Sequence, residues 1–384
     1  MYQKDNEKIQ AICVNFRKAK IIGLGEATHG TAEFHHIRSE IIQYMVQNQG
    51  LRLIVLEDDF LTCLLLNKFL RGGSNKLIPF FSMLYRVWRV KEFGDILQWI
   101  RLWNTKNPSD IVSIAGCDTQ FFDISKKNWD VILDLFEENS PLKALYNTIK
   151  VLKNYFQIVH SPEEDIWEME PKKRSKIYVP VKLDIIKIIK ELRQIKQKSD
   201  KNIYYVIRAI ERNCKSLLSW INFYTAKKDF QKKWDNIDTT RDKFMLQTFR
   251  DCVNMFPSRK VVFYAHNGHV NPSIESTTIG TSLKTLYRAN YYSVLLVFKE
   301  GKFRALDLNS SKSSVFKSDY VFPLEKALSK INRYFFIPVS KDILYKKIKS
   351  IGAAWTKDTK DYPYDLINSD ALIFINSTNP STPI

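Results

Sequence analysis

The sequence has few cysteines and no long apolar stretch, and both absences narrow the class of protein. Its five cysteines never come closer than 38 residues apart, so no Cys-x-x-Cys pair signals a zinc site and no disulfide framework is indicated. No run of about 18 uncharged apolar residues exists, which a membrane-spanning helix would need. The polar start lacks the apolar core of a signal peptide. We therefore expect a soluble, cytoplasmic protein with no membrane span.

Common catalytic signatures are also missing. No Gly-x-Ser-x-Gly sequence occurs, which argues against the usual serine nucleophile of hydrolases. The spacing from Gly25 to Gly30 is that of a phosphate-binding loop, but Thr31 stands where such a loop requires lysine. Gly23 and Gly25 are not followed by the third glycine of a dinucleotide-binding fingerprint. The sequence thus indicates no nucleotide cofactor, and we expect a protein that works without a cofactor.

Acidic residues are fewer than basic ones, and the formal net charge is +18. Residues 171–233 hold 18 Lys and Arg against 5 Asp and Glu, so this region alone supplies +13. Such a region is typical of the solvated faces of lysine-rich helices, and no zinc finger or RNA-recognition motif accompanies it. We expect no specific nucleic-acid partner. Electrostatic attraction of anionic substrates or surfaces is the alternative.

The spacing of hydrophobic residues, which make up 45% of the 384, separates strands from helices. Short apolar runs predict strands at 20–25, 51–57, 111–115, 260–265, 291–298, 303–308, 334–339 and 371–375. Helical periodicity occurs at 6–18, 31–48, 76–104, 128–157, 178–198, 202–226 and 238–255. We predict an α/β fold: a single domain over residues 1–384, with a mixed central sheet flanked by helices and an inserted helical subdomain at about 125–245.

Histidines are scarce, and their placement is informative. Five of the six fall in two windows, each directly after an expected strand: His29, His35 and His36 in the first, and His266 and His269 in the second. The carboxyl ends of strands are where α/β sheets form their sites. We therefore expect His29, His266 and His269 in one site, with the two histidines on the following helix structural or peripheral.

The first window carries groups suited to acid–base chemistry. Histidine is the side chain best matched to proton transfer near neutral pH, and Glu26 stands close enough to fix the tautomer of His29. Glu57 ends the next strand and is expected at the same edge of the sheet. Arg38, on the following helix, is either a site cation that stabilises an oxyanion or orients a carboxylate, or a partner of Asp58. This pattern predicts a hydrolytic site.

Residues 24–31 (Leu-Gly-Glu-Ala-Thr-His-Gly-Thr), with Glu33 and Phe34 behind them, resemble the opening motif of the erythromycin esterase family. Further segments match in chain order: Arg38, the strand 53–57, Gly-Cys-Asp-Thr-Gln at 116–120, Arg241, Asp242 and Met245 as an Arg-Asp-x-x-Met helix, Ala-His-Asn-Gly-His-Val at 265–270, and the last strand at 370–376. Gly268 replaces the usual alanine, and Tyr264 stands where tryptophan is common. Residues 125–235 match only in being helical.

The resemblance implies metal-independent hydrolysis of a carboxylic ester or lactone, a macrolide-esterase-like activity connected with antibiotic resistance. It implies that His29 is a general base acting on water. The matching positions carry over as a set of catalytic polar groups: His29, Glu26, Glu57, Arg38, His266 and His269. The partner is then a small-molecule ester, and the helical subdomain would line its cleft.

Two further residues are candidates for substrate contact, and each has a structural alternative. Asp118 ends an expected strand and either lines the site or caps a turn. Trp88 is core by its spacing or forms one wall of a hydrophobic cleft. Two other functions stay open: a metal hydrolase that uses the same Glu and His cluster, and an accessory protein of polysaccharide biosynthesis.

Overall fold

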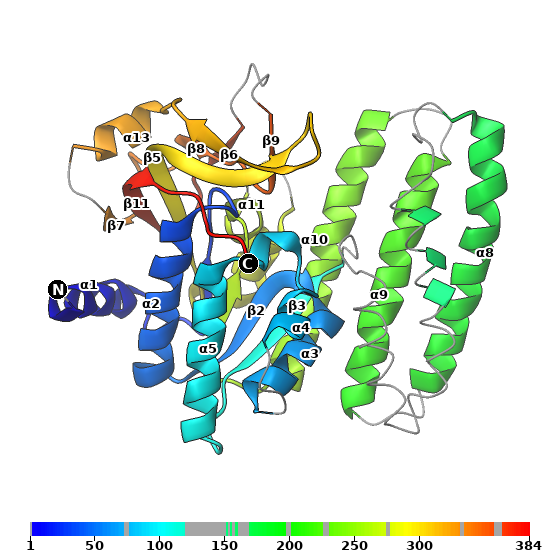
Figure 1. Cartoon of the computed structure of the whole chain (residues 1–384), viewed down its shortest axis with the longest axis horizontal. Helices are drawn as coiled ribbons and strands as arrows, with labels where there is room; N and C mark the ends of the chain where they lie inside the picture. The colour runs from blue at the N-terminus through cyan, green and yellow to red at the C-terminus, as the bar shows by residue number, and fades with distance from the viewer. Residues whose placement is uncertain are drawn as a thin grey trace.

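The computed structural model describes residues 2–72, 77–119, 151–152, 154–155, 158–159, 169–196, 201–225, 230–273, 277–330, 334–356 and 363–384. Figure 1 shows an α/β unit built around a sheet, with three long helices standing upright beside it. These helices are α8 (Pro171–Lys196), α9 (Lys201–Tyr224) and α10 (Phe230–Met255). In the described part of the chain, no helix is long and apolar enough to cross a membrane.

The sheet is mixed and mostly parallel. Its main path has the order β3-β2-β4-β1-β5-β11-β7, in which each neighbouring pair is parallel except β11 and β7. These strands are β1 (Ile21–Leu24), β2 (Leu51–Asp59), β3 (Ser113–Asp118), β4 (Lys260–Tyr264), β5 (Tyr291–Asp307), β7 (Tyr334–Pro338) and β11 (Ala371–Thr378). The predicted α/β fold with a mixed central sheet flanked by helices is confirmed.

Smaller elements extend this sheet at its carboxyl edge. β6 (Ser313–Ser318) pairs antiparallel with β5, and β9 (Ala354–Trp355) pairs parallel with it. β8 (Lys347–Lys349) and β10 (Tyr364–Leu366) form a separate two-stranded sheet. Loops beside these short strands cover the residues that follow β1.

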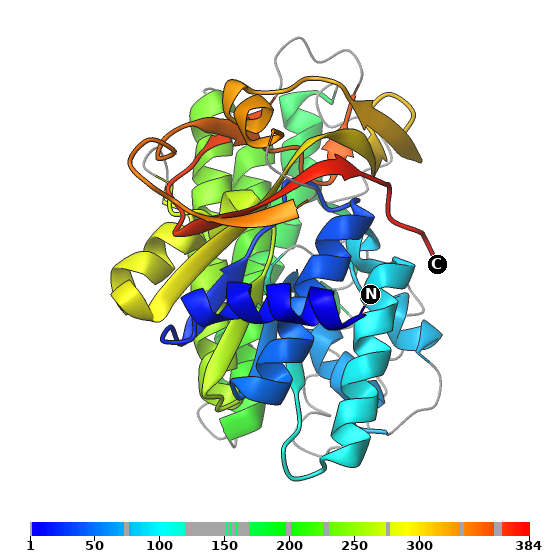
Figure 2. The same ribbon diagram turned by 90° about the vertical axis from the view of Figure 1, so that its left-hand side faces the viewer.

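Helices cover the faces of the sheet. The longer ones are α1 (Tyr2–Asn15), α2 (Ala32–Asn48), α3 (Phe60–Leu70) and α5 (Lys91–Lys106). The shorter ones are α4 (Ile78–Phe81), η1 (Arg86–Trp88), α11 (Asn267–Val270), α12 (Ile279–Tyr287), η2 (Arg288–Asn290) and α13 (Pro323–Leu328). Figure 2 shows α1 lying across the α/β unit, and both views place α2 and α5 side by side.

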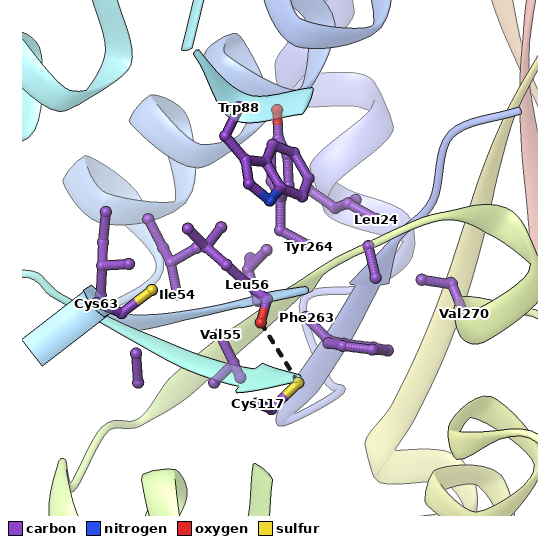
Figure 3. Close-up of a cluster of buried hydrophobic side chains, with 14 of the residues drawn as sticks. Leu24, Ile54, Val55, Leu56, Cys63, Trp88, Cys117, Phe263, Tyr264 and Val270 are labelled. Atoms are coloured by element: carbon purple, nitrogen blue, oxygen red, sulfur yellow. Dashed lines mark hydrogen bonds between the residues drawn. The ribbon is translucent and has the colours of Figure 1, made fainter. Parts of the chain in front are cut away.

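The central strands are apolar along their whole length because both faces are covered. Every residue of β1, β3 and β4 is buried, as expected for parallel strands between two layers of helices. Figure 3 shows Leu24, Ile54 and Phe263 among the side chains of this core. Cys117 lies there too and donates through Sγ to the Leu56 carbonyl at 3.4 Å. All five cysteines are buried and free.

Two sequence expectations about elements are corrected. The helix expected over 76–104 is divided into α4, η1 and α5, because the chain turns at Tyr85 to bring its backbone N–H onto Asp58 Oδ2 at 2.8 Å. The two strands expected at 291–298 and 303–308 are one strand, β5, which passes through Gly301 at a φ of 132°. A side chain at Gly301 would collide with Thr378 on the neighbouring strand.

The described helices of the middle region, α8 to α10, pack in sequence order, α9 lying between the other two. Of the helix expected over 128–157, only 151–152 and 154–155 belong to the described residues, and the remainder lies outside them. The boundaries of the subdomain at 125–245 stay a prediction.

Candidate active site

The carboxyl ends of four adjacent strands bring the expected site residues together. Glu26 and His29 follow β1, Glu57 lies near the end of β2, and Asp118 ends β3. His266 and His269 follow β4, which lies between β1 and β2 in the sheet. Five of these side chains line one cavity of about 610 Å³: His29, Glu57, Asp118, His266 and His269. The convergence follows from parallel pairing, which places all four strand ends at one edge.

The first histidine–carboxylate system consists of His29, which lines the cavity, and of Glu26 and Arg38, which are fully buried behind it. His29 Nδ1 lies 2.7 Å from Glu26 Oε1, and Arg38 donates through Nη2 to Glu26 Oε2. Burial alone raises the pKa of Glu26, but Arg38 and His29 outweigh it and lower the pKa to about 2. Glu26 is therefore ionised, and it accepts a hydrogen bond from the protonated Nδ1 of His29. That tautomer leaves the lone pair of His29 on Nε2, which no hydrogen bond to the described residues engages.

Arg38 contacts Glu26 from the side of the protein interior and not from the cavity. Its side chain is fully buried, and its guanidinium lies 3.7 Å from the centre of the Tyr264 ring. Nε donates to the Phe34 carbonyl at 3.3 Å. Of the roles expected for Arg38, the structure places it where it orients the Glu26 carboxylate, away from an oxyanion formed in the cavity and not paired with Asp58.

The second system is a row of alternating charges. Arg241 donates to both oxygens of Asp118, at 3.0 and 2.7 Å, and to Glu57 Oε1 at 3.1 Å. His269 Nε2 lies 3.2 Å from the same Glu57 oxygen, and its Nδ1 forms an ion pair with Asp242 Oδ1 at 2.9 Å. The order is thus carboxylate, guanidinium, carboxylate, imidazole, carboxylate, drawn from β2, β3, α10 and α11.

This row keeps His269 charged. Burial lowers the pKa of His269, but Asp242 and Glu57 outweigh it and raise the pKa to about 10. For Glu57 burial acts in the opposite direction and raises the pKa. The pairing with His269 and Arg241 outweighs burial, so the pKa of Glu57 lies well below its usual range. His269 is consequently an imidazolium near neutral pH. Its side chain stays partly exposed to the cavity, at 16%.

His266 differs from both other site histidines. Its Nδ1 accepts a hydrogen bond from the Gly268 backbone at 3.1 Å, and its Nε2 lies 3.3 Å from the Ala27 carbonyl. Burial and the nearby His29 lower the pKa of His266 to about 4. It is a neutral ring with both nitrogens occupied, 5.3 Å from His29 between ring centres. This arrangement suits packing and orientation of His29 better than proton transfer.

Trp88 lies under the site and is absent from the described residues that line the cavity. It is fully buried, its ring centre is 5.7 Å from that of His29, and Nε1 donates to the Glu57 carbonyl at 3.0 Å. Figure 3 shows Trp88 beside Tyr264. His35 is buried in the same layer, with Nδ1 3.0 Å from the Tyr264 hydroxyl. Trp88 thus holds the site residues from behind rather than forming a wall for substrate.

The glycines around His29 serve close packing. A side chain on Gly25 would meet Asn267 Oδ1 at 2.2 Å, and one on Gly30 would meet the Arg304 carbonyl at 1.8 Å. The Gly30 carbonyl accepts from the backbone N–H groups of Arg304 and Ser381, each at 2.9 Å. The loop that carries His29 is therefore clamped by β5 and by the chain after β11, which Figures 1 and 2 both show running beside α2 and α5.

Sequence reasoning gave no role to two residues that the structure places at the centre of the site. Arg241 and Asp242, on α10, contact Asp118, Glu57 and His269. The Arg-Asp-x-x-Met match in the resemblance was the only sequence signal for them. Other residues that line the cavity, Val87, Leu306 and Ala353, had no signal because they come from segments far apart in the sequence and carry no motif.

The candidate metal ligands are engaged with one another. Within the described ranges, no three His, Cys, Asp or Glu residues stand in an arrangement that could hold a metal ion. His29 Nδ1 faces Glu26, and His269 faces an acid through each nitrogen. The donor set thus forms ion pairs, in which Arg241 already neutralises two of the carboxylates.

Histidine–carboxylate pairs at the carboxyl edge of a mostly parallel α/β sheet lie where such sheets form binding and active sites. The sequence model of the erythromycin esterase family matches residues 46–378 of the chain. The chain therefore belongs to the erythromycin esterase family, whose members include named esterases and hydrolases. The matched segment begins after Glu26 and His29, so these two residues rest on the motif and the geometry.

Individual relatives agree with this membership at low identity. Erythromycin esterase type I of Escherichia coli is 22% identical over 72% of this chain and 69% of its own length. YbfO of Bacillus subtilis strain 168, which is named as a hydrolase, is 22% identical over 65% of this chain and 56% of its own length. These relatives support a hydrolase.

Solved structures show the same fold. A protein from Bacillus cereus matches with a TM-score of 0.69 and 22% identity, covering 96% of this chain and 91% of that one. A succinoglycan biosynthesis protein matches with a TM-score of 0.67 at 18% identity, covering 95% and 89%. A mutant erythromycin esterase in its open conformation matches with a TM-score of 0.64 at 16% identity, covering 95% and 92%.

Proposed function

We propose that this protein hydrolyses a carboxylic ester or lactone with a water molecule that His29 activates, without a serine nucleophile and without a metal. The observation that carries the proposal is the orientation of His29. Glu26 fixes Nδ1 from below, and the ring lines the cavity with Nε2 left for substrate or water. Family membership supports the reaction class.

The proposed reaction divides the work between two histidines. His29 Nε2 takes a proton from water as the oxygen attacks the carbonyl carbon. The carbonyl oxygen becomes an oxyanion, and the positive charges of His269 and Arg241, which line the same cavity, stabilise it through space. When the tetrahedral intermediate collapses, the leaving oxygen takes the proton back from His29. The products are an alcohol and a carboxylic acid, which becomes a carboxylate by releasing its proton to solvent.

The small-molecule substrate would enter a cavity with two unlike walls. Charged groups, including Glu57, Asp118 and Arg241, form one side, whereas Val87 and Leu306 contribute apolar surface. A volume of about 610 Å³ lies within the usual range for ligand sites, about 300–1,000 Å³. Such a cavity suits an ester with an apolar body, which includes macrolides and simple aryl esters.

The test replaces His29 with alanine and compares it with His36→Ala, since His36 is exposed on the same stretch of chain. We expect the first variant to lose about 10²–10⁴-fold in kcat/KM on aryl esters or macrolides, the usual contribution of a general base. The second should retain the wild-type rate. Equal rates for the two variants on every ester that the wild type cleaves would refute the assignment.

A further inference from the structure

A smaller cavity meets the main one at His29. It measures about 30 Å³ and lies where β5, β6 and the chain after β11 approach the loop of His29. His29 lines both cavities. The groups particular to the smaller one include Arg304, Ser313 and Ser381. A group placed there would therefore stand directly beside the proposed catalytic base.

The two cavities differ in charge. The described residues that line the smaller one include two arginines, Arg86 and Arg304, and no Asp or Glu. Arg86 and Arg241 line the larger one, but there Glu57 and Asp118 are present as well, so Arg304 is the cation particular to the smaller cavity. A small cavity with cationic walls and no acid favours an anionic occupant, because an anion there gains both charge attraction and charge-assisted hydrogen bonds.

Hydrogen-bond donors in the smaller cavity are available. The Ser381 hydroxyl is buried and has no hydrogen-bond partner among the described residues, in a residue that is only 1% exposed. Arg304 donates through Nε to the Ser381 carbonyl at 3.1 Å, and no hydrogen bond to the described residues engages its two terminal nitrogens. A buried hydroxyl without a partner is costly, so an acceptor bound beside it would satisfy the group.

The size of the cavity restricts the occupant. One water-sized centre needs about 10–15 Å³, so about 30 Å³ accommodates a group of two or three heavy atoms. A carboxylate has three heavy atoms, a negative charge and two acceptor oxygens. We infer that Arg304 and Ser381 form a carboxylate-binding subsite beside His29.

This carboxylate has two chemical sources, and both rest on the proposed function. It is either the acid product that every ester hydrolysis releases, or a free carboxylate that the substrate carries, as in a half-ester of a dicarboxylic acid. In both cases the planar guanidinium of Arg304 donates hydrogen bonds to the two carboxylate oxygens side by side. The substrate source assigns the protein to esters that are themselves acids.

Binding is measured without catalysis, by isothermal titration of the full chain with acetate and with succinate at constant ionic strength. Arg304→Met should weaken the binding of the probe by at least about tenfold, since it removes the charge-assisted bonds. Ser381→Ala keeps the backbone contacts of the chain after β11 and should weaken binding of the probe by a few-fold. The matched control is Lys302→Met, an exposed cation on the same strand, which should bind as the wild type does.

The inference is overturned if neither acetate nor succinate binds, or if Arg304→Met and Lys302→Met bind them equally. Because this readout needs no turnover, it stands apart from the test of His29. Circular dichroism establishes that Arg304→Met is folded, and Arg304→Lys, which keeps the charge, should bind more tightly than Arg304→Met.

Kinetics then distinguish the two sources. If the product is the occupant, acetate inhibits hydrolysis competitively, and an aryl acetate and the matching aryl hemisuccinate react at similar kcat/KM. If the substrate supplies the carboxylate, the hemisuccinate reacts at least about tenfold faster, and Arg304→Met abolishes this preference.

Discussion

The two histidine–carboxylate systems at the carboxyl edge of the sheet differ in the number of acids that hold each ring. His29 has one acid, Glu26, whose charge is shared with the buried Arg38. His269 lies between two acids, Glu57 and Asp242. Glu26 orients the ring of His29, and no hydrogen bond to the described residues engages its other nitrogen. The two acids beside His269 instead hold a proton on its ring, although Glu57 also pairs with Arg241.

This difference assigns roles that the residue types alone do not. In this protein one histidine is arranged to accept a proton and the other is already charged. The predictions below remove one system, then the other, and finally compare their dependence on pH and on metal.

Removing the first system should have the largest effect. Glu26→Gln leaves the fully buried Arg38 without a charged partner, which costs about 3–5 kcal/mol in the free energy of unfolding. It also permits the wrong tautomer of His29, so kcat/KM should fall at least about 100-fold. Urea unfolding and aryl-ester kinetics measure the two effects. Adding Arg38→Met should recover part of the stability and none of the activity.

Removing one acid from the second system should have a smaller effect on rate and a clear effect on its pH dependence. Asp242→Asn can still accept the Ile279 backbone N–H, but it no longer supports the charge of His269. The alkaline limb of kcat/KM should move to lower pH, with a loss of about tenfold at pH 8. Asp242→Glu should restore part of the limb. An unchanged profile in Asp242→Asn would remove His269 from the mechanism.

The two systems should stabilise the fold in different pH ranges. The pKa of His269 rises from 6.5 to about 10 on folding, so its stabilisation is complete below pH 6.5 and is lost as the pH rises towards 10. The pKa of Glu26 falls from 4.5 to about 2, so its stabilisation is complete above pH 4.5 and is lost below it.

Thermal unfolding between pH 3 and 10 checks these opposite signs. The difference in Tm between the wild type and His269→Gln should be a few degrees at pH 6 and should shrink towards pH 10. The difference for Glu26→Gln should be largest near neutral pH and should shrink towards pH 3. Differences that stay constant over the whole range would contradict the assigned charges.

The smallest expected effect is that of chelation. If His29 activates water without a metal, dialysis against EDTA should leave kcat/KM unchanged within error, and added Zn²⁺ or Mn²⁺ should not raise it. Elemental analysis of the same sample provides the control. Loss of activity on dialysis, with recovery on addition of one of these ions, would favour the metal hydrolase instead.

The parts of the site that follow strands could be predicted from the sequence. Glu26, Glu57 and His266 stand next to short apolar runs, and parallel pairing takes such positions to one edge whatever the intervening chain does. The depth of Arg38 could not be predicted, because helical spacing gives the face of a residue but not what packs beneath it. The charge of His269 could not be predicted either, because it depends on Asp242, which α10 brings in.

The hydrogen bonds that hold the Gly30 carbonyl have a consequence for folding during synthesis. Its carbonyl accepts from Arg304 and Ser381, both of which the ribosome adds long after the loop itself. The nascent chain therefore emerges with His29 in place in the sequence but unable to adopt its final position, because domains complete their long-range contacts only once the later segments are available. Prematurely terminated chains that lack Ser381 would carry His29, the proposed general base, and remain without activity.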